Sequence, residues 1–287
     1  MAALGISFAL GSALIFTLYS LLSRVTAVKS DEPMTIAILH DFFATVISLM
    51  AFIVIRPAFP GKLSVWVWIA VILSCIGYTI FSATKFFGHK YIEVSYRTQL
   101  TQIAPIATFI GSALILHEEI TLRRLIAVVL IVGGNMIALY KHDGKVSLQG
   151  IRIVLLGAVA IGLSYVADKF ASPSFPLSLY MLITYGIPGI LIFLIFRFQR
   201  KDALGLIKRE LVLRTWKIPF LAFLSVAGYF LFLKAFALVD ASVASPALYS
   251  STILTSLGGI IFLRERSNLR RRIFGAVVVF LGIVLLK

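Results

Sequence analysis

The feature that most constrains this chain is a series of long apolar runs that covers nearly all of its 287 residues. A helix needs about 20 mostly apolar residues to cross the hydrocarbon core of a bilayer. On that basis the sequence predicts ten transmembrane helices, at approximately 3–23, 33–55, 63–86, 94–116, 122–140, 151–170, 176–196, 216–238, 241–262 and 272–286. The runs are continuous and do not alternate between apolar and polar residues, which excludes a transmembrane β-barrel. We therefore expect an all-α polytopic membrane protein.

The composition supports this class and excludes others. Hydrophobic residues make up 60% of the chain and charged residues only 14%, whereas about a quarter of a soluble domain is charged. The net charge of +15 comes from basic residues between the apolar runs, so we expect a lipid bilayer and no nucleic acid as partner. The single cysteine, Cys75, excludes an intrachain disulfide and a CxxC metal site. We expect no cofactor and no bound metal. No basic region precedes the first run, which we expect to stay in the membrane.

The two halves of the chain share motifs in the same order. Segments 116–124 and 263–272 each end one apolar run, carry a glutamate and arginines, and begin the next run. Further matches are Gly11 and Tyr19 with Gly157 and Tyr165, Pro33 with Pro176, Gly77-Tyr78 with Gly228-Tyr229, and Gly134 with Gly282. We therefore expect two five-helix repeats, at 3–140 and 151–286. Because five is odd, the second repeat enters the membrane from the opposite side, as in many secondary transporters.

The sequence also resembles a known family. In the second half the resemblance rests on Ala237–Pro246, Gly258-Gly259, Leu263-Arg264-Glu265 and the apolar run Ile273–Ile283. The first half carries a looser copy of this pattern at Ile103-Ala104-Pro105, Gly111, Glu118-Glu119 and Gly133-Gly134. Together they resemble the EamA-type branch of the drug/metabolite transporter superfamily. The resemblance covers nearly the whole chain and implies ten helices in two inverted repeats around a central cavity. It does not specify the substrate.

Polar residues inside the apolar runs are the candidate binding residues, because burying them in lipid is costly. The fourth and ninth runs carry polar side chains at spacings of three and four, which places them on one helix face. The predicted substrate-binding residues are Tyr78, Thr98, Gln99, Gln102, Tyr229, Ser245 and Tyr249. For the serine and threonine positions, close packing of helices is an equally weighted alternative.

Charged residues inside the runs are few. His40 and Asp41 lie about two turns into the second run and are a candidate proton-coupling pair, because histidine titrates near physiological pH. A pair that reaches the interface or bonds to a neighbouring helix is the alternative. Asp168 and Asp240 lie near expected helix ends and are interpreted as turn residues. Glu118 and Glu265 are interpreted as structural partners of the nearby arginines.

The loop charges predict an orientation that differs from that of the family. The loops on the side away from both chain ends carry 20 of the 27 Lys and Arg residues, and the other side carries 7. Since positively charged loops stay in the cytoplasm, the count places both ends outside. The resemblance implies that both ends are cytoplasmic. We favour the charge count, because it is a property of this chain.

These observations predict a secondary transporter in the cell (cytoplasmic) membrane that moves a small organic metabolite by alternating access, with export as the preferred direction. The sequence has no GxxxxGK[ST] motif, so we do not expect ATP hydrolysis through a P-loop. Its four histidines lie on separate segments and do not form a cluster of catalytic groups or metal ligands, so we expect no enzyme. The few internal charges favour an uncharged or zwitterionic substrate, such as an amino-acid-like or nucleoside-like compound. A non-transporting scaffold or a channel is the alternative. The oligomeric state is left open, and a monomer is compatible with the sequence.

Overall fold

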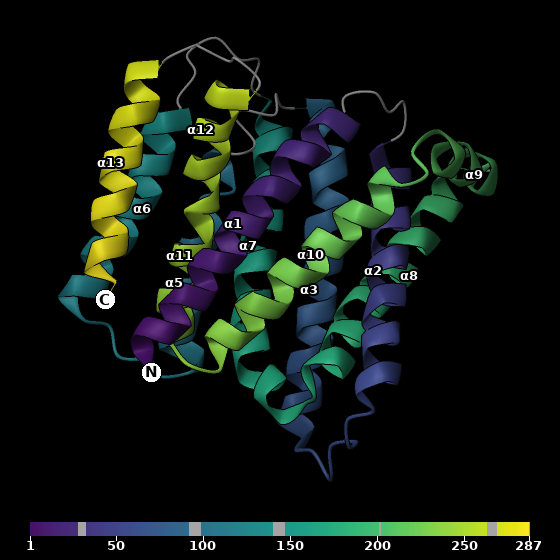
Figure 1. Ribbon diagram of the computed structural model, residues 1–287, viewed down its shortest axis with the longest axis horizontal. Helices are drawn as coiled ribbons and strands as arrows, with labels where there is room; N and C mark the ends of the chain where they lie inside the picture. Colours follow the sequence, from purple (N-terminus) through teal and green to yellow (C-terminus); the bar gives the residue numbers. More distant parts are fainter. Residues whose placement is uncertain (28–32, 92–98, 140–146, 201, 263–268, 287) are drawn as a thin grey trace.

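The computed structural model describes residues 1–27, 33–91, 99–139, 147–200, 202–262 and 269–286, and over these residues it is helical without a strand (Figure 1). The helices are α1 (Ala2–Ala27), α2 (Pro33–Ile55), α3 (Val65–Tyr91), α5 (Ile103–Ile115), α6 (Leu122–Leu139), α7 (Leu148–Ala171), α8 (Leu177–Gln199), α9 (Ala203–Leu213), α10 (Lys217–Phe236), α11 (Ala241–Tyr249), α12 (Ser251–Phe262) and α13 (Leu269–Leu285). A 3₁₀ turn, η1 (Ser172–Ser174), joins α7 to α8. The predicted all-α class is confirmed.

Seven of the described helices are long and apolar enough to cross a membrane, namely α1, α2, α3, α6, α7, α8 and α10. Helix α5 is apolar but shorter. Large apolar side chains on the outside of the bundle are exposed, among them Leu14, Phe42, Ile72 and Phe280. Apolar groups on an outer surface of this kind are suited to contact with lipid.

Helix pairs repeat between the two halves of the chain. Helix α3 of the first half packs against α7 of the second half, and its counterpart α10 of the second half packs against α1 of the first. In the same way, α5 contacts α7, and the counterparts of α5, namely α11 and α12, contact α1. The pairs α2–α8 and α6–α13 each join equivalent helices of the two halves. Both termini lie at the same end of the bundle (Figure 1). Helices α1 and α7, the first helix of each half, begin at opposite ends of the bundle (Figure 1). Each half thus packs its helices against those of the other half, as expected for two inverted five-helix repeats. This arrangement confirms the predicted architecture.

Two of the expected helices are interrupted in their described parts. The run at 94–116 breaks at Thr101–Gln102, and the run at 241–262 breaks at Ser250, between α11 and α12. Pro105 has no amide hydrogen for the Thr101 carbonyl, so the backbone makes tighter bonds there. The Gln102 amide donates to the Gln99 carbonyl at 3.0 Å, and the Ala104 amide donates to the Thr101 carbonyl at 3.0 Å.

The second break follows the same pattern. The Ser250 amide donates to the Ala247 carbonyl at 3.3 Å, and the Ile253 amide donates to the Ser250 carbonyl at 3.1 Å. Each of these bonds spans three residues instead of four, as in a 3₁₀ turn. The Tyr249 carbonyl is therefore available to a side chain from another helix.

Glycines bring α6 and α13 into close contact. A Cβ atom on Gly134 would lie 2.8 Å from the Gly275 carbonyl oxygen, and one on Gly275 would lie 2.5 Å from the Gly134 carbonyl oxygen. A Cβ atom on Gly282 would likewise lie only 2.9 Å from the Ala127 carbonyl oxygen. Small residues allow membrane helices to approach closely, which supplies the van der Waals packing that holds them together.

The long charged connection between α8 and α10 folds into the short helix α9, which the apolar pattern of the sequence does not predict. Helix α9 contacts α2, and its Ala203 packs with Met34, Ile38, Ile192 and Phe196. At its other end, Glu210 and Arg214 form an ion pair although both are buried. Mutual neutralisation explains why these two charges can be buried together.

Candidate functional site

The carboxylate of Asp168 lies at the centre of a polar contact between α3, α7, α8 and α10. Asp168 is 0% exposed and accepts four hydroxyl hydrogen bonds. Ser74 Oγ and Tyr180 Oη donate to Oδ1 at 2.5 and 2.7 Å, and Tyr78 Oη and Tyr229 Oη donate to Oδ2 at 2.6 and 2.8 Å. A carboxylate offers about four lone-pair positions, so these donors occupy all of them. We call these five residues the aspartate cluster.

The four donors come from both halves of the chain. Ser74 and Tyr78 are one turn apart on α3, whereas Tyr180 belongs to α8 and Tyr229 to α10. Helix α3 reaches α7 closely because Gly77 has no side chain, and a Cβ atom there would overlap the Ser164 hydroxyl. The close approach places the α3 hydroxyls within hydrogen-bond distance of the carboxylate.

The interpretation of Asp168 as a turn residue is wrong. Helix α7 continues through Ala171, and the Asp168 side chain points into the bundle, where hydroxyl groups satisfy it. The distances of 2.5–2.8 Å are typical of charge-assisted bonds to a carboxylate. An acidic residue inside an apolar run was the available signal, since such residues face the bundle interior.

Aromatic rings surround the aspartate cluster. The ring centroids of Tyr78 and Tyr229 are 6.0 Å apart with planes at 83°, and those of Tyr78 and Tyr165 are 6.4 Å apart at 64°. The Tyr165 ring meets Phe232 at 4.9 Å and 72°, and the Tyr229 ring meets Tyr185 at 5.7 Å and 84°. We call these five residues the ring cluster. Edge-to-face contacts of this kind turn successive rings roughly perpendicular to one another.

The His40–Asp41 pair lies inside the bundle. His40 Nδ1 and Asp41 Oδ1 are 2.9 Å apart, and each residue is 9% exposed. The His40 ring contacts Tyr19 at 5.5 Å and Tyr185 at 6.3 Å, and Tyr185 bonds to Ser225 at 2.9 Å. Through Tyr185 the pair is joined to the ring cluster. Its role in proton coupling stays a prediction.

A second polar group joins the two helix breaks. Asn135 Nδ2, on α6, donates to Gln102 Oε1 at 2.9 Å and to the Tyr249 carbonyl at 3.0 Å. Gln102 Nε2 is 3.2 Å from Thr252 Oγ1. Gln102 and Asn135 are 1% and 0% exposed. We call these four residues the helix-break cluster. Asn135 donates to the Tyr249 carbonyl that the break in the helix leaves open. The sequence pattern does not single out Asn135 as a functional residue.

The predicted site residues therefore fall into separate places. Tyr78 and Tyr229 meet at Asp168, and Gln102 and Tyr249 meet at Asn135. The Ser245 hydroxyl donates to Thr108 Oγ1 at 3.2 Å between α11 and α5, which fits the packing alternative. Gln99 bonds to the Leu139 carbonyl. Thr98 lies outside the described residues.

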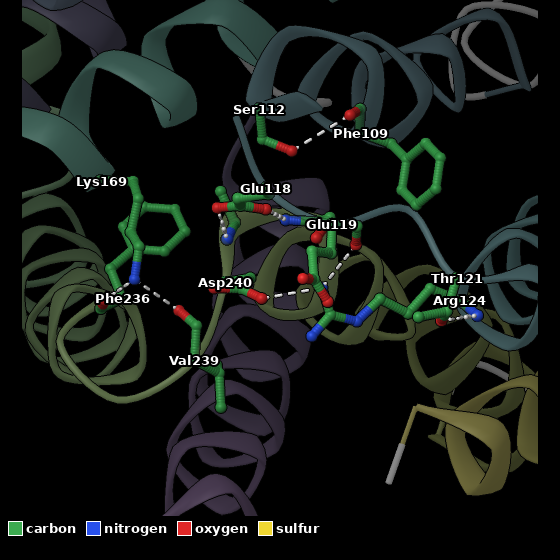
Figure 2. A network of polar contacts seen from close by, with 12 residues as sticks. Phe109, Ser112, Glu118, Glu119, Thr121, Arg124, Lys169, Phe236, Val239 and Asp240 are labelled. Carbon is green, nitrogen blue, oxygen red and sulfur yellow. Dashed lines mark hydrogen bonds and ion pairs between the residues drawn. The ribbon is translucent and has the colours of Figure 1, made fainter. Parts of the chain in front are cut away.

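Charged side chains connect the halves at the end of the bundle that holds both termini. Glu118 accepts the Ala241 and Ser242 amides at 2.7 and 3.0 Å, so its carboxylate caps the amino end of α11 (Figure 2). Arg124 Nη1 lies 2.8 Å from Asp240 Oδ2. The interpretation of Glu118 as an arginine partner is therefore wrong, because its carboxylate accepts bonds from backbone amides. Arg124 forms its ion pair with Asp240 instead. Glu265 lies outside the described residues.

Lys169 completes this arrangement from α7. Its ammonium group donates to the carbonyls of Phe236 and Val239 at 2.5 and 2.8 Å, where α10 ends (Figure 2). We call Glu118, Arg124, Lys169 and Asp240 the clamp. It joins the α5–α6 connection of the first half to the α10–α11 connection of the second. Among the described residues, no group of three or more His, Cys, Asp or Glu side chains is placed to hold a metal ion.

Comparisons with known proteins agree with this architecture. A model of the EamA-like transporter family matches residues 3–140 and 148–287. A search of curated protein sequences finds no match. A solved structure titled only "Crystal structure of protein" has a TM-score of 0.74 and 11% sequence identity, and covers 98% of this chain and 95% of its own. At that identity the likeness establishes the fold alone.

Proposed function

Because the chain belongs to the EamA-like transporter family, we propose that it is a secondary transporter that exports a small organic metabolite across the cell membrane by alternating access. The family makes it a membrane transporter. The mechanism, the direction of transport and the place where the substrate binds are parts of the proposal.

One observation carries the proposal: the aspartate cluster is built from both halves of the chain. Two hydroxyl donors belong to α3 in the first half, and two belong to α8 and α10 in the second half. In transporters with inverted repeats, the substrate site lies between the repeats, near the midplane of the membrane. A polar site whose bonds cross that boundary is placed to respond when one half moves against the other.

The clamp supports alternating access. It holds the two halves together at the end of the bundle where both termini lie, so in this conformation that end is tied across the repeat boundary. Transport by alternating access requires such contacts to form at one end and open in turn. Opening at this end requires separation of Arg124 from Asp240 and of Glu118 from α11.

The chemistry around the site fits a small amphipathic substrate. Tyrosine hydroxyls donate or accept hydrogen bonds, and their rings offer apolar surface. An amino-acid-like or nucleoside-like compound carries both polar groups and an apolar part. The ring cluster and the aspartate cluster share Tyr78 and Tyr229, so both kinds of contact are available at one place.

Counterflow in proteoliposomes tests the proposal. Vesicles that contain the purified protein are loaded with unlabelled compounds from a broad metabolite panel, and uptake of the labelled compound is followed. We expect saturable counterflow for at least one compound and a marked loss of it in Tyr229→Phe. The control is Phe223→Leu, which changes a lipid-exposed ring on the same helix.

Two outcomes would contradict the proposal. A scaffold would show no counterflow over the panel, and a channel would show flux that does not saturate or exchange. Equal counterflow in Tyr229→Phe and wild type would move the substrate site away from the aspartate cluster.

A further inference from the structure

The α8–α10 connection concentrates positive charge at a place far from the aspartate cluster's chemistry. Asp202 is exposed there, whereas Glu210 is buried and forms its ion pair with the buried Arg214. Against this one exposed acid, the described residues of the connection and the adjoining helix ends present exposed basic side chains at Arg197, Arg200, Lys208, Arg209 and Lys217. We call these five basic residues the basic rim. Its net charge is strongly positive.

The bundle holds the basic rim in a fixed place. Helix α9 packs against α2 and α8, where Ala203 contacts Ile38 and Phe196. The Lys217 amide donates to the Arg214 carbonyl at 3.0 Å, so a tight turn leads from α9 into α10. The rim therefore keeps its position relative to helices that are long and apolar enough to cross the membrane.

This place is at the level where a bilayer has its headgroups. Helix α9 lies at the outer edge of the bundle, at the end away from both termini (Figure 1). Trp216, beside Lys217, is 66% exposed, and its ring centroid lies 6.4 Å from that of Phe220 on α10. Tryptophan is enriched at membrane–water interfaces. Trp216 thus marks the level at which α10 enters the membrane.

The exposed side of α9 mixes apolar and basic residues. Leu204, Val212 and Leu213 are 64%, 69% and 63% exposed, and they alternate along the helix with Lys208 and Arg209. A helix that faces water presents polar residues on its outer side. Leucine and tryptophan together with lysine and arginine are instead typical of helices that lie in the interface of a membrane.

We propose that the basic rim binds the headgroups of anionic phospholipids, while the exposed apolar side chains of α9 contact their acyl chains. Clusters of about four to eight basic residues next to a membrane-spanning helix bind anionic lipids through charge complementarity. The loop charges predict that this end of the bundle faces the cytoplasm, whose leaflet carries anionic lipid. The inference goes beyond the proposed transport function and does not depend on the substrate.

Lipid titration tests the binding. Dioleoylphosphatidylglycerol, or dioleoylphosphatidylcholine with the same chains and no net charge, is added to purified full-length protein in uncharged detergent, and thermal unfolding is followed. We expect phosphatidylglycerol to stabilise the protein at an about tenfold lower concentration, and high salt to reduce this difference, because exposed charges are screened. Soluble glycerol 3-phosphate is expected to have no effect. Equal stabilisation by the two lipids, or by glycerol 3-phosphate, would overturn the inference.

A charge-removing variant tests the position of the site. Lys208→Gln combined with Lys217→Gln removes two charges of the basic rim, and we expect the apparent affinity for phosphatidylglycerol to fall about tenfold or more. The matched control is Lys62→Gln combined with Arg123→Gln, which removes two exposed charges at the end that holds both termini. An unchanged affinity in the rim variant, or an equal loss in the control, would overturn the inference.

Tryptophan fluorescence tests the position of α9 independently. Trp66→Phe combined with Trp68→Phe leaves Trp216 as the single tryptophan of the three in the chain. In lipid nanodiscs we expect lipids brominated near the headgroup to quench Trp216 and acrylamide in the water to quench it only weakly. The opposite pattern would place this surface in water, as for a surface that binds an acidic soluble protein, and would overturn the inference.

Discussion

At the scale of single residues, the protein's main property is a buried charge satisfied by neutral groups. Asp168 is reached by hydroxyls of Ser74, Tyr78, Tyr180 and Tyr229, and each removes part of the cost of burying the carboxylate. Hydrogen bonds to a charged group contribute more than bonds between neutral groups. The aspartate cluster is therefore expected to stabilise the fold as well as to bind substrate, and the two contributions can be measured separately.

Removal of one donor tests the structural contribution. We expect Ser74→Ala to lower the free energy of unfolding by about 1.5–3 kcal/mol, because it removes a hydrogen bond to a buried charge. Denaturant unfolding in detergent micelles measures the change. The control is Ser7→Ala, which removes an exposed hydroxyl bonded only to a carbonyl in its own helix. Equal effects at the two positions would show that the Asp168 contact contributes nothing particular to stability.

The helix-break cluster is a second residue-scale feature. Asn135 satisfies both the Gln102 side chain and the Tyr249 carbonyl. We expect Asn135→Leu to lower the free energy of unfolding by about 1–3 kcal/mol, because it leaves buried polar groups without partners. Met136→Leu, at an exposed neighbouring position, is the control and is expected to have little effect. A stable Asn135→Leu protein would mean that the broken helices need no side chain to hold them.

At the scale of secondary-structure elements, the contacts between helices depend on where glycine lies. The crossing of α6 and α13 brings the Gly134 and Gly275 backbones together, so a side chain at either position meets main-chain atoms. Backbone atoms cannot move aside as the end of a long side chain can, and overpacking therefore displaces a whole helix. Gly133, the preceding residue on α6, has no atom within 4 Å of the position of a Cβ.

Two adjacent glycines provide a direct test of this packing. We expect Gly134→Ala to lower the free energy of unfolding by about 1–3 kcal/mol through overpacking. Gly133→Ala is expected to be neutral or stabilising, because alanine favours the helix and has space there. Unfolding of both variants under identical conditions is the measurement. The same loss in both would show that helix propensity, and not the crossing, governs this region.

At the scale of the whole molecule, the two halves are tied together at one end by the clamp. Its members are distant in sequence. Glu118 lies just before α6 and Arg124 at its start, Lys169 lies near the end of α7, and Asp240 precedes α11. The Arg124–Asp240 pair is partly exposed, so its contribution to stability is small. Its expected importance is conformational, because a weak bond across a moving boundary can open during transport.

Chemical labelling tests whether the clamp controls access. Cys75 is the chain's single cysteine, so Cys75→Ser gives a background for Ser242→Cys, which is buried beside Glu118. We expect Arg124→Gln to increase the rate at which a water-soluble maleimide labels this position. Arg123→Gln, an exposed neighbour, is the control. An unchanged rate in Arg124→Gln would show that the ion pair does not hold this end closed.

The orientation of the molecule in the membrane is tested with reporters. The loop charges predict that both termini face outward, because 20 of the 27 basic residues lie on the opposite side. A reporter fused after the C-terminus and active only in the cytoplasm is expected to be silent, whereas the same reporter in the α8–α9 connection is expected to be active. The reverse pattern would support the orientation implied by the family resemblance.

The sequence by itself determined the class, the long apolar runs that form helices, and the inverted repeat. These features depend on local chain properties: each apolar run must be helical in lipid, since its backbone groups find no water there, and an odd number of helices per repeat inverts the second. The positions of Tyr78 and Tyr229 within their helices followed from the same reasoning.

Only the tertiary structure decided what the polar residues meet. The sequence pattern predicts a turn at Asp168 and an arginine partner for Glu118, and it gives no role to Asn135. Each of these residues has its partners on other helices, which the pattern does not reveal. The apolar pattern also does not predict the breaks at Gln102 and Ser250, where Asn135 of α6 donates to the Gln102 side chain and to the Tyr249 carbonyl. Apolar periodicity identifies which residues cross the membrane, but bonds between helices depend on close approaches, such as that at Gly77, which exist only once the bundle is packed.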